Sequence, residues 1–152
     1  MSKIDIKNIK KLREETSASV LDVKKALEEA GGDFEKAKEA LIERGKAIAA
    51  KKTAERTVGA GLIHSYIHTG GNIGSMIQLE CETDFVAKTD EFKDLAQEIA
   101  MQAAIKDYFD VGELLEDEYI RDPSKKVSEL VTEAIAKTGE KIVLSKTARF
   151  SI

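Results

Sequence analysis

Thr83-Asp84-Phe85-Val86 stands between two segments with different patterns of apolar residues. Residues 73–81, which come before it, are rich in apolar and β-branched side chains and indicate a strand. After it, apolar residues recur at helical spacing from Phe92 to Ala103. The four residues therefore predict a strand-to-helix corner, a position where function often concentrates. At this corner Phe85 either folds back over the core or lies exposed.

Length and composition indicate the class of protein. The 152 residues suit one ordinary domain, or a small domain joined to a modest one. There is no apolar run of about eighteen residues and no charged-then-apolar leader, so we expect a cytoplasmic protein without a membrane span. The single cysteine, Cys81, lies in a strand pattern and is interpreted as a small buried residue.

Charge is distributed unevenly along the chain. Residues 1–58 carry 14 basic and 11 acidic side chains, whereas residues 59–152 carry 10 basic and 17 acidic ones. This difference indicates two domains. Neither part has the dense Lys/Arg stripe with interleaved aromatic residues that is typical of nucleic-acid binding. We therefore expect a protein partner rather than a nucleic acid.

Residues 1–45 predict a bundle of three short helices. The first helix carries its apolar residues at three-residue intervals, at Ile6, Ile9 and Leu12. Ser19 caps the second helix, which Gly31-Gly32 ends, and Asp33 caps the third, with Gly45 as its predicted end. Residues 46–58 are rich in alanine and lysine and predict a partly helical linker.

Residues 59–152 predict a small α+β domain. Two strands, at 62–68 and 73–81, flank a glycine-containing turn and form a hairpin. The helix after the corner extends to about residue 106. Another helix from Val127 is ended by Gly139, and a third strand covers 142–150. The fold class is therefore α+β, with a three-stranded antiparallel sheet and packed helices.

Residues 107–122 join the two predicted helices. They hold seven carboxylates and a single base, Arg121, so we interpret them as a solvated connection.

Catalytic and metal-binding patterns are not evident in the sequence. His64 and His68 lie four residues apart on a predicted strand, which separates them by about 13 Å. A single zinc ion held at about 2 Å by each ligand cannot bridge that distance. The chain contains no nucleophile-elbow or phosphate-loop signature. We therefore expect neither an enzyme nor a metal or cofactor site.

Three parts of the sequence resemble the elongation factor Ts family, the nucleotide-exchange factors of bacterial elongation factor Tu. Cys81-Glu82-Thr83-Asp84-Phe85-Val86-Ala87-Lys88 is similar to one family signature, and residues 12–27 are similar to another. Residues 133–142 and 147–150 resemble the C-terminal block of the family. The resemblance spans nearly the whole chain, and it implies a fold like that of ubiquitin-associated domains for residues 1–45.

The resemblance also implies functional residues. The chain would promote GDP release from elongation factor Tu, with Phe85 as a wedge between helices near the bound magnesium of that partner. Asp84 would act at the same contact, and Thr83 and Val86 complete the motif. In the helical domain the resemblance implies partner contacts by Arg13, Val20 and Leu21.

An alternative function is also open. A three-helix domain of this kind could instead serve as an adaptor for ubiquitin-like or peptide partners. A small open sheet exposes edges and one face, so we expect that the chain can pair as a homodimer.

The sequence departs from the family in three respects. Larger family members contain a second core and a coiled-coil excursion that are not seen here. Glu80 and Lys141 stand where the family favours Asn.

Overall fold

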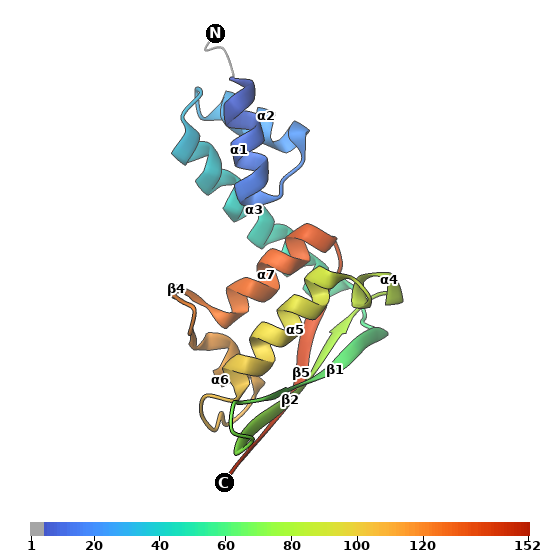
Figure 1. The fold of residues 1–152 in the computed structure, drawn as a ribbon. Coiled ribbons are helices and arrows are strands. Elements are labelled where there is room, and N and C mark those ends of the chain that lie inside the picture. The colour runs from blue at the N-terminus through green and yellow to red at the C-terminus, as the bar shows by residue number, and fades with distance from the viewer. Residues whose placement is uncertain (1–4) are drawn as a thin grey trace. The chain divides into compact units, whose positions relative to one another are not determined.

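The computed structural model describes residues 5–152, apart from the side chains of residues 52 and 53. The chain forms two compact units, one that ends at Lys51 and one that begins at Lys52 (Figure 1). Each unit contains its own buried apolar cluster. Residues 1–4 of the predicted helical domain lie outside the described range.

The first unit is a bundle of three helices, as the sequence predicts. The helices are α1 (Ile6–Thr16), α2 (Val20–Glu29) and α3 (Phe34–Glu55). Ser19 caps α2, and its hydroxyl oxygen accepts the backbone N–H of Asp22 at 3.1 Å. The core of the bundle is made of Leu12, Val23, Ala26, Leu27, Ala37 and Leu41.

Two positions in this unit differ from the sequence prediction. Ile6, which was expected on the apolar face of α1, is 81% exposed. Gly45 does not end the third helix, because α3 continues to Glu55. A glycine ends a helix when it adopts a left-handed conformation, and Gly45 does not have a positive φ. The alanines and lysines that follow are strong helix formers, so they offset the cost of about 1 kcal/mol for an interior glycine.

The second unit is built on a three-stranded antiparallel sheet in the order β1-β2-β5. The strands are β1 (Ala60–Ile67), β2 (Ile73–Cys81) and β5 (Ile142–Ser151). Gly70 and Gly71 form the turn between β1 and β2 with φ values of 101° and 73°, a region that residues with a side chain rarely adopt. The predicted α+β class is confirmed.

Two helices cover one face of this sheet. They are α5 (Asp90–Ala103) and α7 (Val127–Thr138), which lie side by side in Figure 1, in yellow and orange. Alternate β2 residues point towards them and are buried: Ser75, Ile77, Leu79 and Cys81. Gly139 ends α7 with a φ of 74°, as the sequence predicts.

The opposite face of the sheet is exposed. Residues paired across an antiparallel ladder share a face, and Gly74 of β2 pairs with both Ile67 of β1 and Phe150 of β5. A Cβ atom at Gly74 would lie 2.7 Å from Cδ1 of Ile67, which confirms that they share this side. With Ile63 and Met76, these residues form what we call the open sheet face (Ile63, Ile67, Met76 and Phe150). Each of its four side chains is more than half exposed.

The acidic segment between α5 and α7 is folded, which its interpretation as a solvated connection did not include, although most of its carboxylates are exposed. It forms α6 (Val111–Glu116) and a short ladder of β3 (Glu118–Tyr119) with β4 (Asp122–Lys126). Leu114 is fully buried and Tyr119 is 9% exposed. The buried side chain of Gln102 in α5 fixes the segment, because it donates to the carbonyl of Glu118 and accepts the backbone N–H of Ile120.

Candidate partner-binding site at the β2–α5 corner

The corner predicted after β2 contains a single helical turn, α4 (Asp84–Ala87). Thr83 caps it, with the backbone N–H of Ala87 donating to the Thr83 carbonyl at 3.2 Å. Thr89 then caps α5, and its hydroxyl oxygen accepts the N–H of Phe92 at 3.2 Å. Two capping residues in close succession therefore define the start of α4 and of α5.

Phe85 lies on the outer side of this turn and is 88% exposed. Asp84 is also exposed, whereas Val86 is half-buried and Ala87 is buried. The alternative that Phe85 folds back over the core is therefore wrong. An exposed phenylalanine forgoes roughly 1.5 to 3 kcal/mol of burial free energy. A partner with an apolar pocket can recover that free energy.

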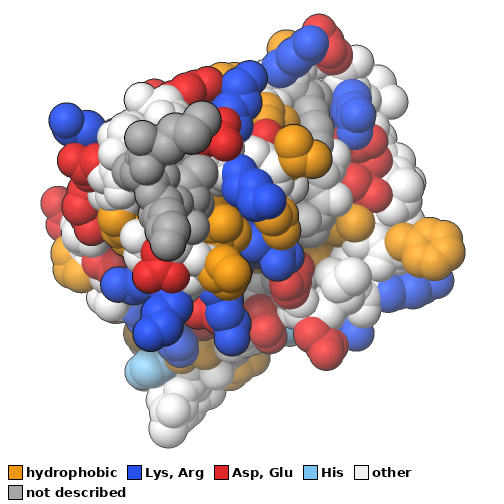
Figure 2. Space-filling view, turned by 90° about the horizontal axis from the view of Figure 1, so that it is seen from above, with side chains coloured by type: hydrophobic (Ala, Val, Ile, Leu, Met, Phe, Trp, Pro, Cys, Tyr) orange, Lys and Arg blue, Asp and Glu red, His pale blue; other side chains and the backbone are white. Residues whose placement is uncertain are grey.

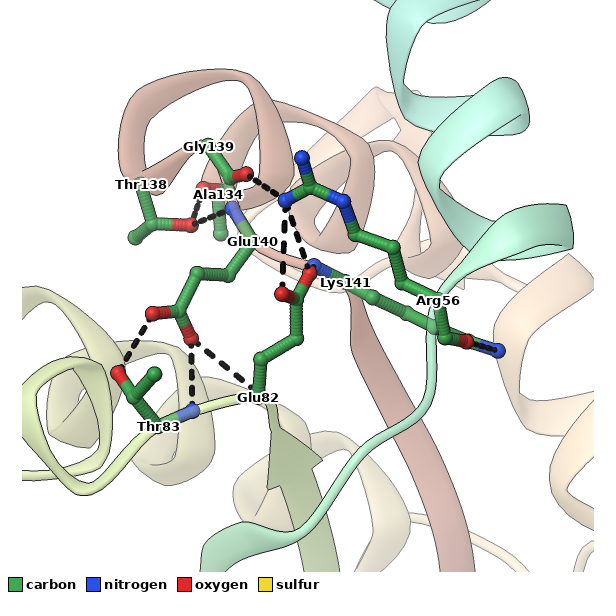
Figure 3. Close-up of polar contacts among 8 residues, drawn as sticks. All are labelled: Arg56, Glu82, Thr83, Ala134, Thr138, Gly139, Glu140 and Lys141. Carbon is green, nitrogen blue, oxygen red and sulfur yellow. Dashed lines mark hydrogen bonds and ion pairs between the residues drawn. The ribbon is translucent and has the colours of Figure 1, made fainter.

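The corner is joined to the turn between α7 and β5 by two glutamates, in a contact that we call the carboxylate clamp (Figure 3). Oε2 of Glu140 accepts the backbone N–H groups of Glu82 at 3.1 Å and of Thr83 at 3.0 Å. Oε1 of Glu140 accepts the Thr83 hydroxyl at 2.5 Å. In return, Oε1 of Glu82 accepts the backbone N–H of Lys141 at 2.6 Å. Each glutamate thus binds the backbone next to the other.

Arg56 connects a third segment to the clamp. Its Nη1 donates to both carboxylate oxygens of Glu82, at 3.3 and 3.4 Å, and to the carbonyl of Gly139 at 3.2 Å (Figure 3). The Lys141 ammonium donates to the carbonyl of Arg56 at 2.8 Å. Lys141 therefore takes part in the clamp through both its backbone and its side chain.

Cys81 lies beneath the corner and is fully buried, as expected. Its Sγ donates to the carbonyl of Thr83 at 3.2 Å. Burial raises the pKa of the Cys81 thiol, and the nearby negative charge of Glu140 raises it further. The thiol is therefore a packing residue that supports the corner from within, because the thiolate that reacts is disfavoured.

The other predicted contact residues belong to the helical unit. Arg13 is an exposed residue of α1, and Val20 and Leu21 form the start of α2. Adjacent helical residues point in different directions, so at least one of the two is expected to be exposed; Val20 is 42% exposed and Leu21 is 81% exposed. The residues after them on the inner side of α2 fill the core instead. Two adjacent apolar side chains of this unit are thus accessible to a partner.

The two histidines have partners within the second unit. Nε2 of His64 lies 2.6 Å from the side-chain oxygen of Gln97, and Nδ1 of His68 lies 2.9 Å from the Tyr66 hydroxyl. Within residues 5–152, the acidic, histidine and cysteine side chains form no group of three that could hold a metal ion. None of the helices in this range is long and apolar enough to span a membrane.

The surface in Figure 2 carries Lys and Arg side chains interspersed with Asp and Glu. Hydrophobic side chains appear between them as separate groups. This distribution is typical of a solvated protein surface.

Local sequence patterns do not predict the contacts among Arg56, Glu82, Glu140 and Lys141. These contacts join residues 26 to 85 positions apart, and local periodicity does not report such pairs. The one available signal was the acidic residue directly after the helix-ending Gly139.

Comparisons with known proteins identify the family. The family model described as Elongation factor TS matches residues 82–152. The chain is 41% identical to elongation factor Ts of Thermoanaerobacter sp. (strain X514) over 192 aligned positions, which cover 97% of this chain and 94% of that protein. It is 43% identical to elongation factor Ts of Thermotoga petrophila, with 95% and 94% covered. With elongation factor Ts of Clostridium botulinum (strain 657), the identity is 45% over 98% of this chain and 48% of that protein.

These similarities cover almost the entire chain, including both units. The chain belongs to the elongation factor Ts family. The alignment with the Thermoanaerobacter protein is longer than the 152 residues of this chain, so that protein contains positions without a counterpart here.

Proposed function

We propose that this chain is an exchange factor that promotes GDP release from elongation factor Tu. The observation that carries the proposal is that Phe85 is 88% exposed on a corner held by the carboxylate clamp. Membership of the elongation factor Ts family supports the same proposal. Thr83, Asp84 and Val86 belong to the same short turn, so they reach the partner together with Phe85.

The proposed mechanism is a thermodynamic coupling between two ligands of the GTPase. Suppose that the chain binds the nucleotide-free partner more tightly than the nucleotide-loaded one by some factor. The bound chain then lowers the affinity of the partner for nucleotide by that same factor. Each tenfold weakening requires about 1.4 kcal/mol. Burial of Phe85 supplies roughly 1.5 to 3 kcal/mol if its pocket opens when the nucleotide contacts relax. Phe85 therefore accounts for about one or two powers of ten, and other contacts supply the rest.

The helical unit supplies a second set of contacts in this proposal. Arg13 offers an exposed guanidinium, and Val20 and Leu21 offer adjacent exposed apolar side chains. These contacts would add affinity without acting at the nucleotide site. We assign this role to a domain of residues 1–45, joined by residues 46–58 to the exchange core of residues 59–152.

The proposed chemistry requires no covalent step. The chain would act in the cytoplasm on a protein partner, and it need bind neither nucleotide nor metal itself. The work of exchange would be done by differential binding to two states of the GTPase.

The open sheet face supports a proposal of self-association. Four large apolar side chains are more than half exposed on one side of a three-stranded sheet. A second copy of the chain could cover this face and withdraw it from water. The acidic charge of residues 59–152 opposes such pairing unless the charged segments point apart.

An adaptor function is the alternative, and the exposed Val20 and Leu21 favour it. Titration calorimetry against nucleotide-free and GDP-loaded elongation factor Tu separates the two proposals. An exchange factor binds the nucleotide-free form more tightly, whereas equal affinities would reject exchange. A fragment ending at Arg56 that retained all of the binding would support the adaptor.

A further inference from the structure

The carboxylate clamp ends two positions before Phe85. Glu140 receives three hydrogen bonds from the corner, two from backbone N–H groups and one from the Thr83 hydroxyl. Both of its oxygens are engaged, so the position and the orientation of Thr83 are fixed together. Thr83 is also the capping residue of α4, the turn that carries Phe85.

The turn depends on such outside support. A helix of four residues is too short to be stable by itself, because the first turn fixes many backbone angles for few hydrogen bonds. Hydrogen bonds to a charged carboxylate are roughly twice as strong as those between neutral groups. Glu140 itself is half-buried. Its three bonds therefore restrict the start of α4 more than the local sequence can.

We propose that Glu140 is a positioning residue for Phe85. Its carboxylate orders α4 in the free protein, so that the aromatic ring is presented in the orientation that the partner requires. Ordering before binding removes an entropic cost from association. This inference rests on the proposed exchange function insofar as Phe85 contacts elongation factor Tu.

Two variants and a matched control test the positioning itself. Glu140→Ala removes all three acceptor contacts, whereas Glu140→Gln keeps the shape and loses the charge. Glu133→Gln is the control, because this α7 carboxylate pairs with Lys125 at the surface, at 2.7 Å, outside the clamp. Relaxation measurements by nitrogen-15 NMR report the backbone order of residues 83–86.

Glu140→Ala should lower the order parameters of these residues from about 0.85 to below about 0.6, values that separate rigid from flexible backbone. Glu140→Gln should give an intermediate decrease, and Glu133→Gln should give none. If Glu140→Ala does not fold, the decrease in Glu140→Gln decides the question. Unchanged order in the folded variants would overturn the proposal.

A double-mutant cycle tests whether Glu140 acts through Phe85. Glu140→Gln should slow catalysed nucleotide release about tenfold, in keeping with the loss of a charge-assisted hydrogen bond. In a Phe85→Ala background the same change should have no further effect. Equal slowing in both backgrounds would overturn the proposal, because Glu140 would then act on the fold in general.

The two measurements also separate failure of the inference from failure of the proposed function. If the unmodified chain does not accelerate release, the exchange function is wrong. The order parameters then decide alone whether Glu140 positions Phe85.

Discussion

Phe85→Ala removes an exposed aromatic side chain of the corner and leaves its backbone contacts in place. Phe85 is 88% exposed, so the free protein loses little buried surface. The change in the free energy of unfolding should stay within about 0.5 kcal/mol, as for other surface substitutions. In the complex the variant loses roughly 1.5 to 3 kcal/mol of burial. At about 1.4 kcal/mol per factor of ten, catalysed release should slow by about ten- to a hundredfold.

Two other phenylalanines provide controls for this prediction. Phe109 is 93% exposed but lies in the segment after α5, so Phe109→Ala should leave both stability and exchange unchanged. Phe92 is 1% exposed, and Phe92→Ala should cost about 3 to 5 kcal/mol of stability. The three variants thus distinguish loss of an aromatic ring, loss of core packing and loss of the corner contact.

The assay combines stopped-flow release of a fluorescent GDP from elongation factor Tu with melting curves on the same samples. The reasoning is refuted if Phe85→Ala melts much earlier and its folded fraction exchanges normally. It is also refuted if Phe109→Ala slows release as much as Phe85→Ala does.

Three further predictions concern the two units and pH. Removal of residues 1–52 should leave a folded remainder with weaker binding to the GTPase, and unchanged affinity in titration calorimetry would reject the docking role of the helical unit. Light scattering should detect a dimer that Met76→Glu on the open sheet face weakens, whereas the mass of one chain at every concentration would contradict self-association. Burial and a hydrogen bond to a carboxylate raise the pKa of Tyr108 and of Tyr119 to about 12 each. The pKa values in the folded protein exceed the ordinary 10.0, so the two neutral phenols stabilise the folded state. This contribution to the free energy of unfolding is present below pH 10 and is lost as the pH rises towards 12. Ultraviolet titration of the folded protein should therefore find both phenols neutral at pH 10, and their ionisation there would contradict this.

Local sequence signals were sufficient for much of the fold. The β-branched residues of 73–81 and the Gly70-Gly71 turn specify a hairpin within a few positions of each other, and the structure confirms it. Ser19 and Gly139 are capping residues whose effect is also local. The exposed corner could be placed for the same reason, because a strand pattern ends and a helix pattern begins on either side of Phe85.

The features that were missed depend on contacts distant in sequence. The acidic segment was interpreted as solvated because it holds seven carboxylates and a single base, yet Leu114 and Tyr119 are buried and Gln102 pairs with its backbone. Gly45 is a local exception, because the helix-forming residues directly after it continue the helix that a glycine was expected to end. The carboxylate clamp joins Glu82 and Glu140, which are 58 positions apart in the sequence but flank the paired ends of β2 and β5, and each residue by itself resembles an ordinary surface acid.

The most direct test of the exchange proposal is the rate of fluorescent GDP release from purified bacterial elongation factor Tu, measured in excess unlabelled GDP. The rate should rise with the concentration of this chain and approach a plateau as the ternary complex saturates. A rate equal to spontaneous release at every concentration of folded chain would contradict the account.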